Sequence, residues 1–247
     1  MYRHHASPAQ LDQSPLVLER AVARHLQTVL RVREGTEVEL FDGQGRTVAS
    51  RVAACGRHSL TLEFTAPPVL HPPPACRLAL CPCVSKGRRM DWTLEKAAEL
   101  GADRILPLLS ARSVVQVETP AEAADKQERW QRIVIEATRQ CGGAWVPSVA
   151  APLPFDQALP RLRAIRPLLA AALTPDARPL REVLAALAGE HPPREAAWLV
   201  GPEGDFTPGE IEHLREAGAR LCSLGTRVLR TETAAIYGLA VLGAAWL

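Results

Sequence analysis

A glycine-rich turn follows a strongly apolar segment late in the chain. Residues 198–200 are apolar, Gly201 and Gly204 come after them, and Thr207 with Pro208 then begins a predicted helix. Ligands of open α/β sheets bind at the carboxyl ends of the strands, and a residue without a Cβ lets backbone N–H groups approach them closely. The turn has neither the Walker nor the dinucleotide-binding glycine spacing. It therefore predicts either a ligand site of another type or an ordinary connection between strand and helix.

Residues 224–235 hold a second concentration of polar groups. Arg227, Arg230 and Glu232 stand among several threonines, between a predicted strand at 220–223 and an apolar predicted helix. Threonines can cap a helix, and exposed arginines can be surface charge. Helix capping and surface charge do not explain why so many polar groups lie between two buried elements. The pattern therefore favours a binding loop.

Three cations, Lys86, Arg88 and Arg89, follow another predicted strand. Ammonium and guanidinium groups are the side chains that hold phosphate in nucleic-acid sites. The cluster is equally typical of a solvated loop. Glu95 and Glu99 follow it four residues apart, a spacing that favours the polar face of a helix.

Composition excludes several classes of protein. The 247 residues are 47% hydrophobic and 23% charged, with a formal net charge of +2. These values are typical of globular proteins, and the small net charge means that any nucleic-acid contact must come from a local basic patch. Residues 1–15 lack the apolar core of a signal peptide. The longest uncharged apolar stretch, 234–247, is shorter than the roughly 18 residues that span a bilayer, so we expect a cytoplasmic protein without a membrane segment.

The six cysteines do not form a metal-binding pattern. Cys81 and Cys83 are two residues apart, but no further cysteine or histidine pair follows at zinc spacing. We expect free thiols in a reducing compartment, and no metal.

A run of prolines between residues 66 and 75 divides the chain, because that density suits neither a helix nor a central strand. The division predicts a domain at 1–70 and another at 75–247. Alternating segments in the first domain, with a helix near 19–30 and an Asp42-Gly43 hairpin signal, predict a small antiparallel barrel. The predicted strands are 38–41, 47–54 and 59–64.

Apolar runs alternate with helical patterns in the second domain. Short runs of this kind are typical of strands buried on both faces of a parallel sheet. The predicted strands are 78–83, 104–108, 168–173, 197–200 and 220–223. The predicted helices are 92–100, 125–141, one from Thr207 to near Gly218 that opens with a capping box, and 234–247.

Taken together, the motifs resemble the RsmE-type ribosomal RNA uridine-N3 methyltransferases of the SPOUT superfamily. The similarity spans nearly the whole chain, and the segments 200–204 and 224–234 are its most specific parts. Two departures are evident: Asp205 stands where the family usually has a second glycine, and Gly143 where it often has a basic residue. The matching residues are Arg3, His25, Leu26, 29–31, Gly35, 41–43, Lys86, Asp91, Trp92, Glu95, Lys96, 99–101, Arg112, Ser113, Arg129, Trp130, Arg132, Ile133, Glu136, Ala137, 140–142, 200–204, Leu224, Gly225 and 228–234.

The resemblance implies an α/β fold in which a PUA-like β-barrel precedes a SPOUT-type parallel sheet with a deep C-terminal trefoil knot. It also implies a homodimer, which suits the apolar helix at 234–247, and S-adenosylmethionine bound in the knot largely by backbone groups. The implied cofactor-binding residues are Leu173, Val200, Gly201, Leu224, Gly225, Val228, Leu229, Arg230, Thr231, Thr233 and Ala234.

Ribosomal RNA or the small ribosomal subunit is the implied substrate, with methylation at N3 of a uridine in 16S RNA. Small net charge requires the basic groups of both domains to gather into one surface. The predicted RNA-binding residues are Arg3, Arg31, Arg33, Lys86, Arg88 and Arg89.

Chemistry at uracil N3 suggests catalytic candidates. The N3 proton must leave, and negative charge then spreads to the carbonyl oxygens, where an arginine would stabilise it. Arg230 and Arg112 are candidates for that role. Glu232 or Glu203 could accept the proton, although either carboxylate could instead hold backbone N–H groups in a tight turn.

Two other functions compete with this hypothesis. One is an RNA-binding module that keeps the fold without using a cofactor, which the intact loops at 200–204 and 224–234 disfavour. The other is a SPOUT enzyme that methylates a ribose hydroxyl of transfer RNA, which the N-terminal barrel and the segment 230–234 disfavour.

Overall fold

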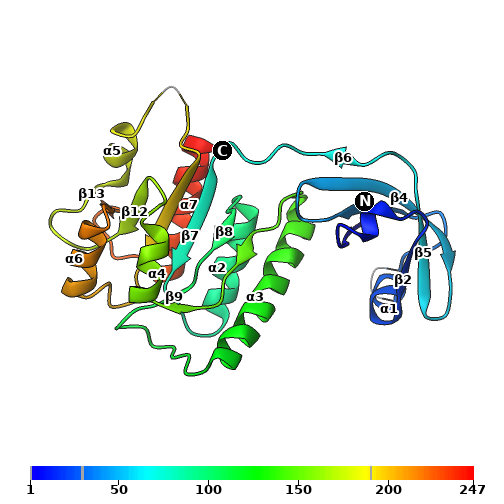
Figure 1. Cartoon of the computed structure of the whole chain (residues 1–247), viewed down its shortest axis with the longest axis horizontal. Helices are drawn as coiled ribbons and strands as arrows, with labels where there is room; N and C mark the ends of the chain where they lie inside the picture. Colours follow the sequence, from blue (N-terminus) through cyan, green and yellow to red (C-terminus); the bar gives the residue numbers. More distant parts are fainter. Residues whose placement is uncertain (1, 29–30, 190) are drawn as a thin grey trace. The chain divides into compact units, whose positions relative to one another are not determined.

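The structure is a computed structural model that describes residues 2–28, 31–189 and 191–247 (Figure 1). The chain forms two compact units: Met1–Pro73 with Thr138–Val146, and Pro74–Ala137 with Pro147–Leu247. Residues 138–146 thus belong to the first unit, which a division at the proline run does not predict. Their place depends on contacts between distant segments, such as the bonds from Gly45 N to Ala144 O and from Val146 N to Gly43 O.

The first unit is built on a six-stranded sheet with the order β1-β3-β4-β5-β2, in which β6 pairs with β4. β1 runs parallel to β3, and the other neighbours are antiparallel. The predicted hairpin and strands are confirmed. The helix is α1, Arg20–Thr28, while residues 29 and 30 of its predicted end lie outside the described residues. The strands are Tyr2–His5 (β1), Leu16–Glu19 (β2), Glu37–Phe41 (β3), Arg46–Cys55 (β4), Ser59–Phe64 (β5) and Val69–Leu70 (β6), with a short 3-10 helix at Gln10–Asp12.

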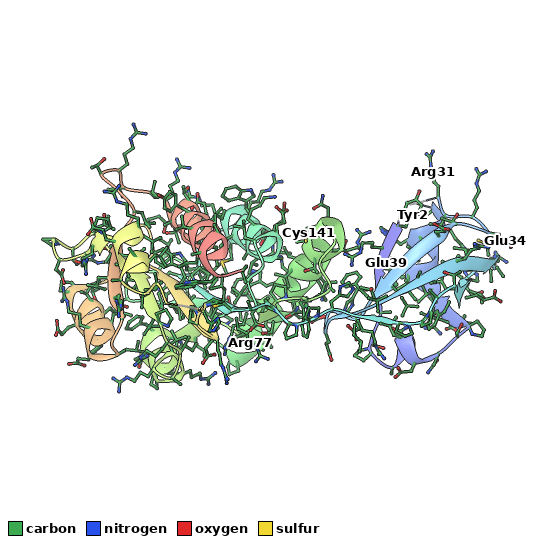
Figure 2. The ribbon with its side chains drawn as sticks, turned by 90° about the horizontal axis from the view of Figure 1, so that it is seen from above. Tyr2, Arg31, Glu34, Glu39, Arg77 and Cys141 are labelled. Atoms are coloured by element: carbon green, nitrogen blue, oxygen red, sulfur yellow. The ribbon has the colours of Figure 1, made fainter. Side chains whose placement is uncertain are left out.

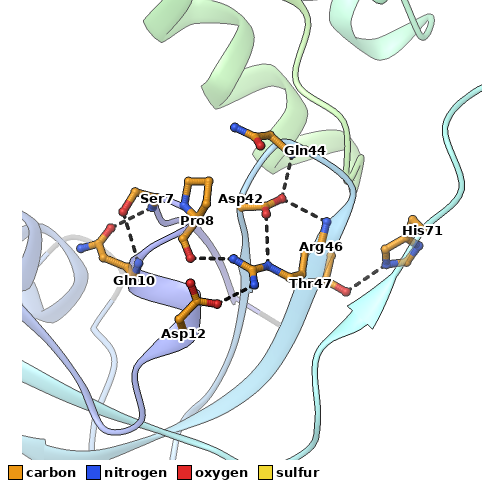
Figure 3. A network of polar contacts seen from close by, with 9 residues as sticks. All are labelled: Ser7, Pro8, Gln10, Asp12, Asp42, Gln44, Arg46, Thr47 and His71. Carbon is orange, nitrogen blue, oxygen red and sulfur yellow. Dashed lines mark hydrogen bonds and ion pairs between the residues drawn. The ribbon is translucent and has the colours of Figure 1, made fainter.

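A polar network closes the β3–β4 hairpin (Figure 3). Asp42 Oδ1 accepts hydrogen bonds from the backbone N–H groups of Gln44 and Arg46, which gives the predicted turn its shape. Arg46 also pairs with Asp12, at 2.7 Å, and donates to the Pro8 carbonyl. These bonds satisfy the buried Asp42 carboxylate, so the network has a structural explanation.

Arg3 also has a structural role. Its guanidinium pairs with Glu39 at 2.5 Å and lies 4.5 Å from the centre of the Phe41 ring. It also donates to the carbonyls of Thr138 and Gly143, both at 3.0 Å. The RNA contact predicted for Arg3 stays a prediction, and in the structure these partners occupy the guanidinium inside the first unit. The cation satisfies carbonyls at a helix C-terminus, where positive charge is stabilising.

The second unit contains a parallel sheet of seven described strands, in the order β10-β8-β7-β14-β12-β15-β13. The five predicted strands are confirmed, except that 104–108 divides into two short strands around Leu106 and Pro107. β9 and β11 form a separate parallel pair. The bounds are Arg77–Pro82 (β7), Arg104–Ile105 (β8), Leu108–Leu109 (β9), Ser148–Val149 (β10), Leu153–Pro154 (β11), Leu168–Ala171 (β12), Arg178–Pro179 (β13), Glu195–Val200 (β14) and Arg220–Ser223 (β15).

Helices cover both faces of this sheet. Alternate residues of β14, Ala197 and Leu199, join an apolar core with α4 and α6, while α7 and α2 pack together and α7 also packs on β7 and β14. The predicted capping box opens α6, with Glu210 N donating to Thr207 Oγ1 and Thr207 N to Glu210 Oε2. The helices are Arg88–Glu99 (α2), Pro120–Cys141 (α3), Phe155–Leu162 (α4), Leu180–Ala185 (α5), Pro208–Glu216 (α6) and Thr231–Trp246 (α7).

α7 packs unusually close to β14. Trp198, fully buried on β14, lies directly under Gly238, so that a Cβ built at Gly238 would be 2.1 Å from Trp198 Cε2. The indole N–H also donates to the Ala234 carbonyl at 3.2 Å. The contact therefore requires a glycine on the helix, although glycine lowers helix propensity by about 1 kcal/mol relative to alanine.

Replacing this glycine should destabilise the second unit. We expect Gly238→Ala to lower the free energy of unfolding by about 1–3 kcal/mol, because overpacking outweighs the gain in helix propensity. Gly209→Ala in α6 is the matched control, since a Cβ there meets nothing within 4 Å. Urea denaturation would compare the two midpoints. Equal stability of both variants would contradict the close packing.

Candidate functional site

A pocket lies where β12, β14 and β15 end, at the carboxyl edge of the parallel sheet, as the position of the glycine-rich turn predicts. Three connections and the first turn of α7 form its walls. Its lining residues are Ala171, Ala172, Leu173, Val200, Gly201, Pro202, Glu203, Asp205, Cys222, Leu224, Gly225, Arg227, Val228, Leu229, Thr231 and Ala234.

Nine of the eleven predicted cofactor residues line this pocket, and Arg230 and Thr233 do not. Both are exposed. Arg230 is the N-cap residue of α7, and Thr233 lies in the first turn of that helix, which begins three residues earlier than predicted. Of the predicted catalytic candidates, Glu203 lines the pocket, whereas Glu232 does not and lies next to the lining residue Thr231. Whether these residues bind a cofactor stays a prediction.

Sequence analysis missed several lining residues. Ala171, Ala172 and Cys222 end the strands on either side of the pocket, and the order of the strands brings them together. Asp205 and Arg227 lie inside the two segments that the sequence singled out. Their polar side chains are a signal in the sequence that could have identified them. The resemblance implies binding mainly by backbone groups and therefore does not include them.

The start of α7 is tied to the turn after β14. Thr231 is buried, and its hydroxyl donates to the Gly201 carbonyl at 3.0 Å. Arg230 is extended, with ψ at 154°, before the helix begins. This bond joins the two polar segments of the sequence at one wall of the pocket.

Asp205 links the turn after β14 to the connection after β12. Its Oδ2 accepts the Leu173 N–H at 2.9 Å, and its Oδ1 accepts the Phe206 N–H at 2.8 Å. The residue has a φ of +57°, a left-handed conformation that aspartate tolerates better than most residues but glycine adopts freely. The carboxylate therefore stabilises a turn that a glycine would form without such bonds.

Arg112 holds the same turn from outside. Its guanidinium donates to the Gly204 carbonyl at 2.6 Å, and the neighbouring Ala111 N–H donates to Glu210 Oε1 at 2.9 Å. Arg112 does not line the pocket. The structure thus gives this catalytic candidate a contact that positions the turn.

Arg89 joins the two candidate proton acceptors. Its guanidinium lies 2.7 Å from Glu203 Oε1 and 4.0 Å from Glu232 Oε1. The Glu203 side chain is 40% exposed, whereas that of Glu232 is 10% exposed. Glu232 Oε2 is buried without a hydrogen-bond partner in the described protein. A buried carboxylate oxygen without a donor is costly, so this atom is suited to receive a hydrogen bond from a ligand.

The loop after β15 also offers unpaired backbone groups. Among the residues that the structure describes, no hydrogen bond satisfies the peptide groups of Arg227, Val228 and Leu229. Val228 is 71% exposed beside the pocket, and Leu173 across from it is 61% exposed. Apolar side chains beside free peptide groups are typical of small-molecule sites.

The remaining predicted RNA-binding cations are on the surface. Arg31, Arg33, Lys86 and Arg88 are exposed, and their side chains make no ion pair within the described ranges. Arg31 projects away from the first unit (Figure 2). Arg89 differs from them because its guanidinium forms an ion pair with Glu203.

Sequence reasoning missed a basic groove in the first unit. It lies between α1 and the β4–β5 turn and is lined by Arg20, Arg24, His25, His58, Ala21 and Thr28. Arg20 has a φ of +50°, and its N–H donates to the His58 carbonyl at 2.8 Å. A left-handed arginine is strained, and here that conformation places a cation at the start of the groove.

Three buried cysteine thiols are held in the neutral form. Burial raises the pKa of Cys81, Cys83 and Cys222 to about 12, so these groups are neutral near pH 7. Within the described residues, no cluster of three metal-ligating side chains occurs, and no helix has the length and apolar content needed to cross a membrane.

Comparisons with known proteins agree with this geometry. The profile of a family described as RNA methyltransferase domain matches residues 72–243, and that of an RNA methyltransferase PUA domain matches residues 18–65. The second unit therefore contains an RNA methyltransferase domain, and the first is PUA-like.

Similarity to individual proteins shows which family of RNA methyltransferases this chain belongs to. The ribosomal RNA small subunit methyltransferase E of Synechocystis is 31% identical over 98% of this chain and 77% of its own length. That of Mycobacterium tuberculosis is 33% identical over 89% of this chain and 82% of its own. A crystal structure of the Neisseria gonorrhoeae protein of that name, bound to S-adenosyl methionine, has 31% identity and a TM-score of 0.86, covering 100% of this chain and 98% of its own. The chain belongs to the ribosomal RNA small subunit methyltransferase E family.

Proposed function

We propose that this protein transfers a methyl group from S-adenosylmethionine to N3 of a uridine in small-subunit ribosomal RNA. Family membership supports an S-adenosylmethionine-dependent ribosomal RNA methyltransferase. The observation that carries the proposal is the pocket at the carboxyl ends of β12, β14 and β15, inside the matched methyltransferase domain. Assignment of N3 as the acceptor rests on the resemblance and on the chemistry of side chains beside the pocket.

The lining residues fit this cofactor. Unpaired peptide groups at 227–229 offer donors and acceptors for an adenine edge, and the exposed side chains of Leu173 and Val228 offer apolar surface for its ring. The carboxylates of Glu203 and Asp205 face a ligand that carries positive charge. When bound, the cofactor supplies a methyl group already activated by a sulfonium.

Glu232 is the proton acceptor in this proposal. Uracil N3 is a weak nucleophile until its proton leaves, and Glu232 Oε2 is a buried acceptor that lacks a donor. Arg89 lies beside the other oxygen of Glu232 and pairs more closely with Glu203. The Glu203 carboxylate already accepts from the Arg89 guanidinium at 2.7 Å, so it is less available to receive the N3 proton and more suited to hold Arg89 beside the pocket.

Charge on the uracil oxygens requires a cation. Arg230 stands at the N-cap of α7, one residue before the pocket-lining Thr231, and its exposed side chain is available to a bound base. Arg112 supports the reaction indirectly, because its bond to the Gly204 carbonyl positions the turn.

The C-terminal chain is threaded in this proposal into the trefoil knot expected of the family. β15 lies between β12 and β13, whereas the following helix α7 packs on β7 and β14. The chain must therefore return across β12, and the Thr231–Gly201 bond holds that returning segment against the turn after β14. These placements support a threaded path for residues 224–230.

Two surfaces are proposed to bind macromolecules. The groove with Arg20 and Arg24, together with Arg31 and Arg33, would hold RNA phosphates. The second surface is the outer face of α7, which would form a homodimer. That face exposes Tyr237, Ala240 and Ala244, and an apolar helix face of this kind is typical of subunit interfaces.

Methylation of ribosomal RNA tests the proposed function. Purified protein is incubated with S-adenosylmethionine and small subunits from cells that lack the protein, and nucleotide-resolution mass spectrometry locates the methyl group. We expect one 3-methyluridine. Methylation of a ribose, of another base or of no nucleotide would contradict the proposal.

The same assay separates the two glutamates. Glu232→Gln should slow methyl transfer about hundredfold or more, the usual contribution of a general base, while cofactor affinity stays within about twofold of the original. Glu203→Gln should retain more activity, and Glu99→Gln is the matched control, because Glu99 pairs with Lys96 and does not line the pocket. A larger loss in Glu203→Gln than in Glu232→Gln would assign the proton to Glu203.

RNA binding tests the groove. Because each phosphate contact releases counterions, replacing Arg20 and Arg24 with alanine should weaken RNA binding and lower the salt dependence by about one unit of slope per lost contact. S-adenosylmethionine affinity should not change. Arg132→Ala, which removes an exposed arginine paired with Glu128, is the control. An unchanged slope in the double variant would exclude the groove.

Light scattering tests the dimer. The intact protein should have twice the mass of one chain at micromolar concentration, and Tyr237→Glu should shift it toward the monomer because a charge is costly inside an apolar interface. The circular dichroism of that variant should be unchanged, since Tyr237 is 47% exposed. A monomeric intact protein would contradict the proposed interface.

A further inference from the structure

The pocket contains one carboxylate that has no cation to balance it. Asp205 lines the pocket, and among the described residues its two oxygens accept hydrogen bonds only from the backbone N–H groups of Leu173 and Phe206. Within the described ranges it forms no ion pair. Glu203, the other acidic lining residue, pairs with Arg89 at 2.7 Å. The negative charge of Glu203 is therefore largely neutralised by Arg89, whereas that of Asp205 is not neutralised by a cation.

Arg227 is the cation that also lines the pocket. Its side chain is exposed and makes no ion pair in the described protein, so solvent and salt screen its charge. Asp205 is only partly exposed, and its bonds to two backbone groups hold it in place. A fixed, partly buried charge acts on a neighbouring ligand more strongly than a mobile, solvated one.

The backbone conformation at this position does not require an aspartate. Asp205 has a φ of +57°, which glycine adopts without strain. The carboxylate therefore adds something beyond the shape of the turn: a link between two pocket walls and a negative charge.

We infer that Asp205 determines specificity between the methylated cofactor and its demethylated product. The inference rests on the proposed function. S-adenosylmethionine and S-adenosylhomocysteine differ only by the methyl group and by the positive charge on sulfur. Negative charge from Asp205 attracts the sulfonium and gains nothing from the neutral thioether. The aspartate thus favours binding of the substrate form and release of the product after transfer.

The ratio of the two affinities measures the attraction between Asp205 and the sulfonium. A change in the shape of the turn does not affect this ratio. Both ligands share the adenosine and the amino-acid parts, so a loosened turn weakens both by a similar factor. Loss of the charge acts on the α-ammonium of both ligands alike, whereas the attraction to the sulfonium is lost for S-adenosylmethionine alone. The ratio of dissociation constants, product over substrate form, therefore isolates the electrostatic contribution of Asp205 and does not depend on catalytic activity.

Isothermal titration calorimetry at low ionic strength tests the inference with Asp205→Asn and Asp205→Gly. In both variants the ratio should fall by about three- to tenfold, the size expected for a unit charge near a partly exposed site. Asp176→Asn is the matched control, because Asp176 pairs with Arg215 and does not line the pocket. It should leave the ratio unchanged.

Other outcomes have distinct meanings. Parallel weakening of both ligands in the two Asp205 variants would overturn the inference and leave Asp205 as a link between loops. An unchanged ratio with unchanged affinities would overturn it as well. Absence of binding of either ligand to the intact protein would instead contradict the proposed function, and the inference with it.

Discussion

The contact between α7 and the indole of Trp198 is the interaction on which the rest of the second unit depends. Gly238 brings the helix backbone against the ring, and the indole N–H donates to the Ala234 carbonyl. This places Thr231 where its hydroxyl reaches the Gly201 carbonyl. The close packing of Gly238 on Trp198 thereby fixes the start of α7 at the carboxyl edge of the parallel sheet. The pocket exists because the two polar segments of the sequence meet at that point.

Features set by neighbouring residues could be predicted from the sequence. The capping box of Thr207 and Glu210 joins residues three apart, and the hairpin at Asp42 closes within a few residues. The strands of the parallel sheet were recognisable because burial on both faces gives short apolar runs. Their carboxyl ends indicated where a pocket would form, although the strand order that brings β12 beside β14 and β15 could not be read from spacing.

The chemistry of the site depends on partners that are far apart in sequence. Asp205 meets Leu173 across 32 positions, and Arg89 meets Glu203 across 114. No local periodicity marks such pairs, so the sequence does not indicate that the Arg89 guanidinium lies 2.7 Å from Glu203 and 4.0 Å from Glu232. The partners of Arg3 near Thr138 are equally hidden in the sequence, since they follow 135 residues later. In each case a cation that has no evident partner in the sequence forms an ion pair in the fold.

The sheet order has a consequence for synthesis of the chain. The pocket takes its walls from residues 171–173, 200–205 and 222–234, so its last component is the first turn of α7. A nascent chain that stops short of residue 231 lacks that component, and its Trp198 indole also lacks the contact with Gly238. Such a chain already contains the described strands of the sheets, since β15 ends at Ser223. The pocket is therefore completed by a segment synthesised after all the described strands of the sheet that holds it.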